Sequence, residues 1–336
     1  MWIVFIVLIA LLGSLKVGAC AGPDGYAIRV SLSDQVGEGD SFMGIRLLGV
    51  LQLPAIAIDG MALDSLSGLA WDEDADLLYA LSDTGKLFHL RPQFSDGRLR
   101  DVQVLTAYVL HDANGRSLKA SWADSEGLAI ENGANGIPGD SQLIVSFEGQ
   151  PRIARYSPTG KWLGEESLPA MLEDVERYAH SNRTLEAVTW HPGWGILTAP
   201  ERPLQEGPVD RVPICALTGR CWVYPLYKAP NSALVAIETL PDGSLLTLER
   251  AFVSLLRPLV IALRRTRLPD APEGPLTVED VAVFDTSRGW LLDNFEGLTH
   301  HRSQRFFMIS DDNSHFLQST LLVYFERVIP NGISAR

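Results

Sequence analysis

One short pattern recurs five times along the chain and limits its fold more than any other feature. Each copy starts with a small or acidic residue, enters a short alternating strand, turns, and returns in an apolar strand that ends in an acid. The copies start at Ser67, Glu126, Glu186, Ala236 and Glu296. Their spacing is roughly 50 to 60 residues, which suits a propeller blade of three or four antiparallel strands. We therefore predict an all-β protein, a β-propeller.

The number of blades depends on the two ends of the chain. The segment 44–51 has the composition of a strand, and so has the segment 318–325. Paired with each other, these segments predict a sixth blade that closes the ring. All-β barrels and propellers commonly reach 336 residues as a single domain, and no shift in composition marks a boundary. Residues 22–336 are therefore predicted to form one domain, a monomeric propeller of six blades.

One stretch departs from the strand pattern. It runs from residue 168 to residue 180, with Pro169 near its start. Its apolar residues have helical spacing, at Leu168, Met171, Leu172, Val175 and Tyr178. A short inserted helix is predicted near 168–180, before the third repeat.

The first 21 residues have the features of an export signal. The apolar run from Trp2 to Leu12 is too short to span a bilayer but suits the core of a secretory signal. Cleavage after Ala19 or Ala21 fits a signal peptidase. The sequence Val-Gly-Ala-Cys also resembles a bacterial lipobox, in which cleavage precedes Cys20 and this residue is lipidated. We expect an exported protein, either periplasmic or anchored to the envelope by lipid.

Charge and cysteines agree with this location. The formal net charge of −13 argues against binding to nucleic acid or to anionic lipid, so a lipid anchor is the only membrane contact expected. Cys215 and Cys221 frame a short loop, and an exported protein meets an oxidising compartment. The pair predicts a disulfide, with two free and partly buried thiols as the alternative.

The acids of the repeats are the main candidates for chemistry. In a propeller the first strand of each blade lines the central channel, so Glu126, Glu186 and Glu296 are predicted to converge there, with Ser67 and Glu238 in the remaining places. The acids that end the second strands form a neighbouring ring: Asp83, Glu148, Glu201, Glu249 and Asp311. So many carboxylates repel one another unless protons or cations intervene. Oxygen ligands in this number select Ca²⁺ or Mg²⁺.

A structural interpretation of the same acids stays open. A glutamate at a strand start can accept hydrogen bonds from the next blade, and Arg202 and Arg250 directly follow two of the acids. Ion pairs could then satisfy these sites without metal. The sequence has no Gly-x-Ser-x-Gly elbow, no His-Glu-x-x-His and no phosphate-binding glycine loop, which argues against those enzyme classes.

The repeats resemble the phytase-like proteins, an exported bacterial family described by an esterase-like activity of phytase. The similarity covers residues 44 to 326 and is carried by Ser67-Gly-Leu-Ala with Ser82-Asp83, Glu126-Gly-Leu with Phe147-Glu148, Asn182-Arg-Thr-Leu-Glu186-Ala with Glu201-Arg202, Leu248-Glu249-Arg250, and Asn294-Phe-Glu296-Gly-Leu-Thr with Ser310-Asp311-Asp312-Asn313. Two departures are Ala187, where the family usually has glycine, and the fourth repeat, which has no leading Glu-Gly.

The resemblance implies a fold similar to the calcium-dependent β-propeller phytases, with Ca²⁺ at the acidic mouth of the channel. It implies that Glu126, Glu186 and Glu296 serve catalysis, and that Arg202 and Arg250 contact a small phosphorylated substrate. The implied metal ligands are Asp83, Glu148, Glu201, Glu249 and Asp311. The alternative is a non-enzymatic envelope propeller that binds a ligand or protein. A carboxylester hydrolase would need a nucleophile that the sequence does not identify.

Overall fold

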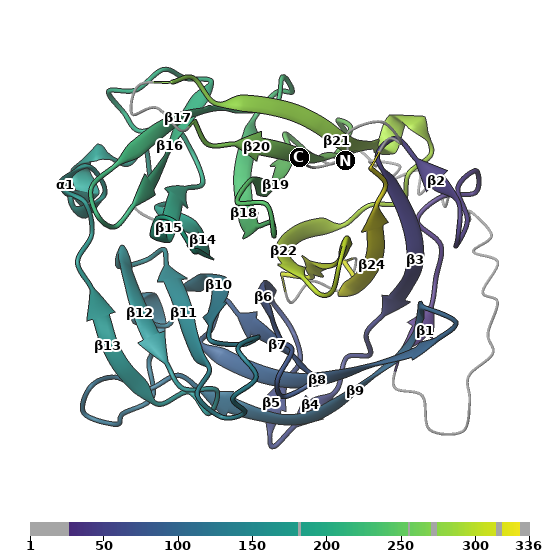
Figure 1. The fold of residues 1–336 in the computed structure, drawn as a ribbon, viewed down its shortest axis with the longest axis horizontal. Coiled ribbons are helices and arrows are strands. Elements are labelled where there is room, and N and C mark those ends of the chain that lie inside the picture. The colour runs from purple at the N-terminus through teal and green to yellow at the C-terminus, as the bar shows by residue number, and fades with distance from the viewer. Residues whose placement is uncertain (1–26, 181–182, 255, 270–273, 314–317, 330–336) are drawn as a thin grey trace, which may run out of the picture.

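The computed structural model describes residues 27–329, without 181–182, 255, 270–273 and 314–317. Four-stranded antiparallel sheets stand around one central axis in this part of the chain, as Figure 1 shows. The predicted β-propeller is therefore confirmed. The predicted signal peptide and Cys20 lie outside the described residues. No helix in the described ranges is long and apolar enough to cross a membrane.

The first four blades are formed in chain order, each from the channel outward. Blade 1 consists of β6 (Leu66–Asp72), β7 (Leu77–Ser82), β8 (Lys86–Ser95) and β9 (Arg98–Val109). Blade 2 consists of β10 (Ser125–Glu131), β11 (Gln142–Phe147), β12 (Arg152–Tyr156) and β13 (Trp162–Glu166). Blade 3 consists of β14 (Leu185–His191), β15 (Gly195–Pro200), β16 (Arg211–Ala216) and β17 (Cys221–Pro225). Blade 4 consists of β18 (Ser232–Thr239), β19 (Leu245–Ala251), β20 (Val260–Arg267) and β21 (Thr277–Asp285).

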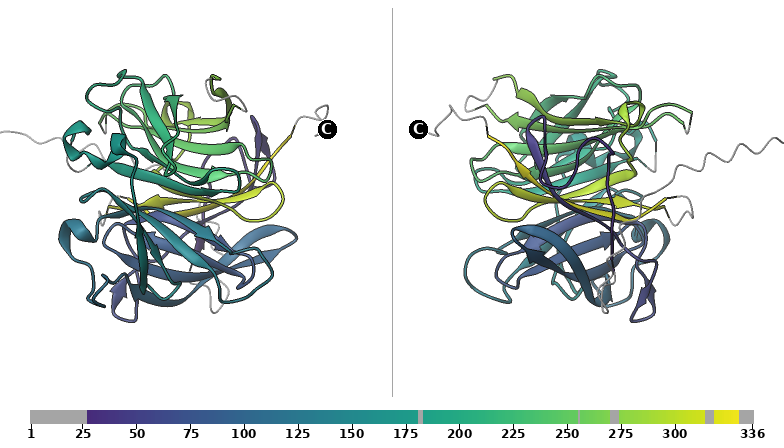
Figure 2. Two further views of the ribbon diagram at one scale, coloured as in Figure 1. Left: turned by 60° about the vertical axis from the view of Figure 1, so that its left-hand side comes forward. Right: turned by 90° about the vertical axis from the view of Figure 1, so that its right-hand side faces the viewer.

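The fifth blade joins the two ends of the described chain. It consists of β22 (Asn294–His300), β23 (Arg305–Asp311), β24 (Leu321–Arg327) and β3 (Ile45–Gln52). The short strands β1 (Ile28–Arg29) and β2 (Ser41–Phe42) pair with β3, and β4 (Ala57–Ile58) with β5 (Met61–Ala62) forms a separate hairpin. In Figures 1 and 2 the purple β3 lies beside the yellow β24.

The predicted six blades are wrong, and the described chain forms five. The segment 44–51 does not start a blade of its own. Its strand β3 pairs with β24 along seven residues, from Leu321 opposite Gln52 to Arg327 opposite Ile45. Without β3, the edge of β24 would present unpaired backbone groups to solvent. The early strand therefore completes the last blade and closes the ring.

The inserted helix near 168–180 is shorter than predicted. It is reduced to one α-helical turn, α1 (Ala170–Glu173), and one 3-10 turn at Val175–Arg177. Asp174 between them is extended, and its side chain accepts a hydrogen bond from the backbone N–H of Glu176. An aspartate in this role starts a new turn and ends the preceding one.

Five apolar clusters fill the spaces between neighbouring blades, one at each interface. Strand alternation explains this arrangement, since successive side chains point to opposite faces of a sheet. In β7, Leu78 and Ala80 pack against blade 5, whereas Tyr79 and Leu81 pack against blade 2. Each sheet is thus buried on both faces.

The disulfide between Cys215 and Cys221 is present, as predicted. The two residues stand opposite each other in the hairpin of β16 and β17. This bond crosslinks the outer half of blade 3.

Candidate functional site

Each innermost strand carries a β-bulge near its start, where the pairing with the second strand shifts by one residue. A bulge inserts an extra residue and redirects its side chain. The residues at these bulges are Ser67, Glu126, Glu186, Val235 and Glu296. Three of the five blades therefore present a glutamate at the same end of the channel.

Glycine permits the close approach of neighbouring innermost strands at this level. A Cβ atom on Gly127 would lie 2.5 Å from the carbonyl oxygen of Glu186 and 2.6 Å from Oγ of Ser146. The Ser146 hydroxyl bridges the two neighbouring innermost strands at this point. It accepts a hydrogen bond from the N–H of Gly127 at 2.9 Å and donates one to the Glu186 carbonyl at 2.7 Å. The Gly in Glu-Gly-Leu thus has a packing role.

The bulge glutamates and the acids after the second strands meet in one cavity of about 230 Å³, which we call the acidic cup. Its carboxyl groups belong to Asp83, Asp124, Glu126, Glu148, Glu186, Glu201, Glu296 and Asp311. The remaining lining residues are Arg183, Arg250 and Asn313. Eight carboxyl groups therefore face two guanidinium groups, and full ionisation would leave a large excess of negative charge.

Blade 2 supplies the most acidic wall of the acidic cup. Carboxylate oxygens of Asp124, Glu126 and Glu148 all lie within 4.8 Å of one another. Asp124 was not predicted from the sequence, although it stands only two residues before Glu126. It lies directly opposite Glu148, whose backbone N–H donates to the Asp124 carbonyl at 2.9 Å. Three oxygen ligands at this spacing fit a hard divalent cation, whose remaining ligands would be water or substrate oxygens.

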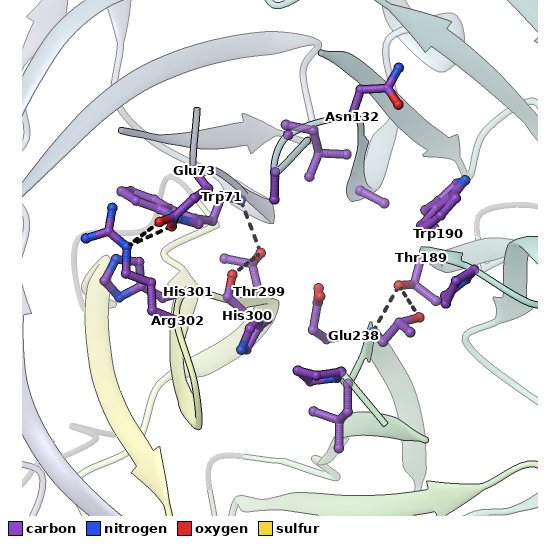
Figure 3. A pocket seen from close by; sticks show the side chains of 18 of the residues that line it. Trp71, Glu73, Asn132, Thr189, Trp190, Glu238, Thr299, His300, His301 and Arg302 are labelled. Carbon is purple, nitrogen blue, oxygen red and sulfur yellow. Dashed lines mark hydrogen bonds and ion pairs between the residues drawn. The ribbon is translucent and has the colours of Figure 1, made fainter. Parts of the chain in front are cut away.

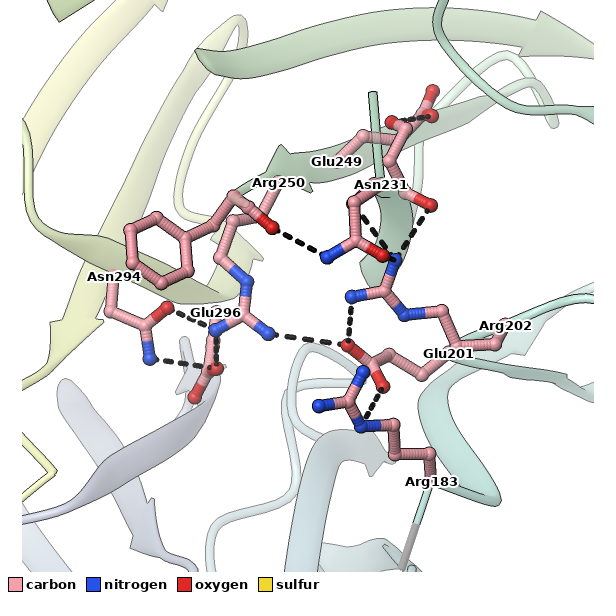
Figure 4. A network of polar contacts seen from close by, with 10 residues as sticks. Arg183, Glu201, Arg202, Asn231, Glu249, Arg250, Asn294 and Glu296 are labelled. Carbon is pink, nitrogen blue, oxygen red and sulfur yellow. Dashed lines mark hydrogen bonds and ion pairs between the residues drawn. The ribbon is translucent and has the colours of Figure 1, made fainter. Parts of the chain in front are cut away.

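The opposite wall is held together by Arg250 (Figure 4). Its Nη1 atom donates to Glu296 Oε1 at 2.5 Å, and its Nη2 atom donates to Glu201 Oε1 at 3.2 Å. Asn294 adds a hydrogen bond to Glu296 at 2.9 Å. Arg250 therefore connects blade 4 with blades 3 and 5, and it pairs with two of the eight carboxyl groups while supplying one positive charge.

Two predicted residues do not reach the acidic cup. Glu249 is buried among blade side chains, where Tyr224 donates to it at 2.5 Å and Arg264 at 3.0 Å. Arg202 contacts Glu201 at 3.2 Å but extends away to the carbonyls of Asn231 and Ser232. The structure thus places both in the packing between and behind the blades.

Register explains why blade 4 differs. The ring position after each second strand holds Asp83, Glu148, Glu201 and Asp311 in the other four blades, opposite a residue two before the bulge. In blade 4 that position pairs with Ala233, and it is occupied by Arg250 and not by Glu249. Adjacent residues of a strand face opposite sides, so the arginine enters the acidic cup and the acid faces the core.

Arg183 is a further lining residue that the sequence did not single out. Its side chain is 43% exposed, and its Nε atom lies 3.9 Å from Glu201 Oε2. It belongs to the segment Asn-Arg-Thr-Leu-Glu that carries part of the family resemblance, which was the available signal. Its only ion pair among the described residues is long, so most of its guanidinium stays accessible beside the acidic cup.

Burial and mutual repulsion raise the pKa values of the clustered carboxyl groups. Burial is the largest cause in each case, followed by neighbouring carboxylates for Glu126, Glu186 and Glu148. The pKa of Glu126 and that of Glu186 lie well above the usual range, and that of Glu148 is raised to about 9. The pKa of Asp83 is raised to about 7. The acidic cup therefore holds protons or cations at neutral pH.

Below the acidic cup the channel is closed. The innermost strands leave a space of only about 10 Å³ there, which is close to the volume of one water molecule. The aliphatic residues that close it are Leu69, Leu128, Val188, Ile237 and Leu298. The acidic cup is thus open at one end, and any ligand enters and leaves by the same mouth.

The fold and the site define the chain as a closed five-bladed propeller protein with a carboxylate cup at one end of its channel. A family model described as phytase-like, with esterase-like activity of phytase, matches residues 62–314. Since this match covers most of the chain, the protein belongs to the phytase-like family. A search of curated proteins found no match.

Two solved structures match the chain over most of its length, at low identity and low TM-score. A gluconolactonase from Xanthomonas campestris is 15% identical, with 88% of this chain and 99% of that chain covered and a TM-score of 0.38. The β-propeller domain of Cps50 (Swd1) from Myceliophteria thermophila is 11% identical, with 89% and 98% covered and a TM-score of 0.39. Similarity at this level does not bear on activity.

Proposed function

We propose that the protein is an exported, Ca²⁺-dependent hydrolase of phosphoesters and that the acidic cup is its active site. One observation carries the proposal, namely the eight carboxyl groups that share a cavity of about 230 Å³ with only two arginines. Carboxyl groups in such excess must be neutralised by protons or cations, and an all-oxygen ligand set suits Ca²⁺. Membership of the phytase-like family supports hydrolysis of a phosphorylated substrate.

Within the acidic cup, Asp124, Glu126 and Glu148 would hold the cation, because their oxygens are close enough to share it. A bound divalent cation supplies polarisation of a phosphoryl oxygen and a lower pKa for an attached water. Glu186 also lines the acidic cup, and its backbone carbonyl accepts a hydrogen bond from Ser146 of blade 2.

The arginines support recognition of an anion on the opposite wall. Arg183 stands exposed at the rim, and Arg250 lies more buried in that wall, between Glu201 and Glu296. The volume of the acidic cup suits a phosphate group with a few waters rather than a whole larger substrate, since drug-sized ligands need roughly 300–1,000 Å³. The rest of the substrate would remain outside the mouth.

Export is part of the same proposal. The disulfide between Cys215 and Cys221 is typical of proteins in oxidising compartments. Mass determination of the mature chain from a bacterial envelope fraction tests cleavage near residue 21 and lipidation of Cys20. A mature chain that retains residues 1–21 unmodified would contradict export by this signal.

A non-catalytic function is the second candidate, because Arg250 gives two of the acids, Glu201 and Glu296, a purely structural role as ion-pair partners. It ties Glu201 and Glu296 across three blades. If the remaining carboxyl groups act in the same way, the protein is a non-enzymatic propeller that binds a ligand or a protein.

Thermal unfolding in EDTA and then in millimolar Ca²⁺ separates the two functions. Under the proposal, Ca²⁺ at 100 times its Kd stabilises the fold by about 2.7 kcal/mol, and p-nitrophenyl phosphate is hydrolysed only with Ca²⁺. Glu126→Gln removes both effects. Glu165→Gln, on the exposed side of β13 in the same blade, leaves both intact. An unchanged melt together with no hydrolysis would support the structural role.

A further inference from the structure

The channel has a second cavity at its other end, with a volume of about 650 Å³ (Figure 3). The five aliphatic residues that close the channel below the acidic cup, Leu69, Leu128, Val188, Ile237 and Leu298, form what we call the aliphatic plug. Residues that line the second cavity lie two positions further along the same innermost strands. Leu128 precedes Ile130, Val188 precedes Trp190, and Ile237 precedes Thr239 along β10, β14 and β18. We call this space the distal cavity. Its volume lies within the range of small-molecule sites.

The carboxyl group of Glu238 points into the middle of the distal cavity (Figure 3). The sequence analysis placed Glu238 in the ring of bulge residues with Glu126, Glu186 and Glu296. In the structure, Glu238 lies three residues beyond the blade 4 bulge at Val235. Burial raises the pKa of Glu238 to about 8, and the backbone N–H of His300 donates to it. Glu238 is therefore separated from the acidic cup by the plug.

Glu238 has no ion-pair partner among the described residues. The single arginine that lines the distal cavity, Arg302, is already paired with Glu73 at 2.7 Å and with Asp76 at 3.2 Å. The neighbouring His300 carries no compensating charge near neutral pH, because burial lowers its pKa. The distal cavity thus contains one central carboxyl group and lacks a cation for it.

The walls around Glu238 are mostly apolar or already satisfied. Trp190 is partly exposed at one side of the distal cavity, and no arginine of the described chain lies over its ring. Arg302 covers the other tryptophan, Trp71, at 5.7 Å. The hydroxyl groups of Thr189 and Thr239 bond to each other at 3.0 Å. Among the described lining residues, Glu238 is therefore the carboxyl group without an ion pair, and Trp190 is the tryptophan whose ring no arginine covers.

We propose that the distal cavity binds an organic ammonium ion, whose charge pairs with Glu238 and whose apolar part lies along Trp190. Ammonium groups are attracted both to carboxylates and to the faces of tryptophan rings. The net charge of −13 favours the approach of a cation. A metal ion does not suit this cavity, because Glu73 is engaged by Arg302 and the one remaining lining carboxyl group, Glu238, is far short of the six or more oxygens that Ca²⁺ takes.

Calorimetric titration with 2-phenylethylamine and with 2-phenylethanol tests the proposal, since the two probes have similar shape but only the amine is charged. Saturating Ca²⁺ is kept in the buffer to block the acidic cup. The amine is expected to bind at one site, and the alcohol about tenfold more weakly or not at all. Glu238→Gln and, independently, Trp190→Ala should each weaken the amine by about tenfold.

Two variants serve as controls for charge and for location. Glu165→Gln removes a carboxylate from the exposed side of β13, and Glu126→Gln removes one from the acidic cup; both should bind the amine as the original chain does. Equal binding of the alcohol, absence of saturable binding, or weakening by Glu126→Gln alone would overturn the proposal. Thermal melts of Glu238→Gln and Trp190→Ala check that each variant is folded during the titration.

Discussion

At the residue scale, a shift of one position decides which side chains take part in the site. Glu249 and Arg250 are adjacent, yet Arg250 lines the acidic cup while Glu249 contacts Tyr224 and Arg264 in the core. The pattern of an acid at the end of each second strand suggested Glu249. The pairing of β18 with β19 places Arg250 there instead.

Replacing Arg250 tests its role in joining three blades. Arg250→Met leaves Glu201 and Glu296 buried without their common partner, so the free energy of unfolding should fall by about 3–5 kcal/mol. Urea denaturation without metal measures this loss. Arg267→Met removes an exposed pair with Glu279 and should cost less than about 1 kcal/mol. Equal losses in the two variants would show that Arg250 is not a buried tie.

His301 gives the stability a defined dependence on pH. Burial lowers its pKa to about 4, while the unfolded chain keeps a value near 6.5. Between these values the unfolded state binds more protons, so this contribution to stability is complete above about pH 6.5 and is lost as the pH falls toward 4. Its Nδ1 atom lies 2.8 Å from the Tyr324 hydroxyl.

His301→Gln should therefore flatten the decline of the melting temperature between pH 6.5 and 4 relative to the original chain. Parallel thermal scans across that range measure the difference between the two proteins. An identical pH profile in the variant would show that His301 does not cause the decline.

At the scale of the elements, each glutamate of the site depends on a β-bulge and on the small residue that follows it in the innermost strand. The bulge directs the glutamate into the acidic cup, and the small residue lets the next strand approach. Ala187 takes the place of glycine in blade 3 and is fully buried, so blade 3 has room for a methyl group that blade 2 lacks at Gly127.

Gly127→Ala tests the close approach of the strands. The added Cβ would lie 2.5 Å from the Glu186 carbonyl oxygen, which belongs to backbone and cannot move aside easily. We expect a loss of about 1–3 kcal/mol in the free energy of unfolding and weaker Ca²⁺ binding through displacement of Glu126 and Glu186. Gly164→Ala in β13, where no atom lies within 4 Å of the added Cβ, is the matched control. Equal stability in the two variants would contradict this account.

At the scale of the whole molecule, the ring is held closed by pairing between the start and the end of the chain. The strand β3 supplies the outer position of blade 5 and also packs on blade 1 through Leu48 and Leu51. Residues 280 positions apart are thereby hydrogen-bonded, as with Arg46 and Glu326.

Removal of the closing strand should damage the entire fold. A chain that starts at residue 54 lacks β3 and leaves β24 with an exposed edge. We expect it to lose the cooperative thermal transition and to associate, as measured by calorimetry and light scattering. A chain that starts at residue 22 should retain one transition. Cooperative unfolding of the shorter chain would show that β3 is dispensable for closure.

Much of the fold and part of the site were predictable, for local reasons. The first and second strands of each repeat follow from alternation and turn composition, which are properties of short segments. Glu126, Glu186 and Glu296 were predicted to converge because one motif recurs at equivalent positions. The family resemblance predicted the same acids, and the family model confirms the family itself.

The sequence by itself determined the all-β repeat, its family, its cysteine pair and the glutamates of three blades, because each depends on neighbouring residues or on repetition of one motif. Only the tertiary structure decided that the blades number five, that Arg250 replaces an acid in the ring, and that Asp124 and Arg183 join it. It also decided that Glu238 belongs to the distal cavity. These outcomes depend on strand register and on pairing between distant segments, which no local pattern specifies.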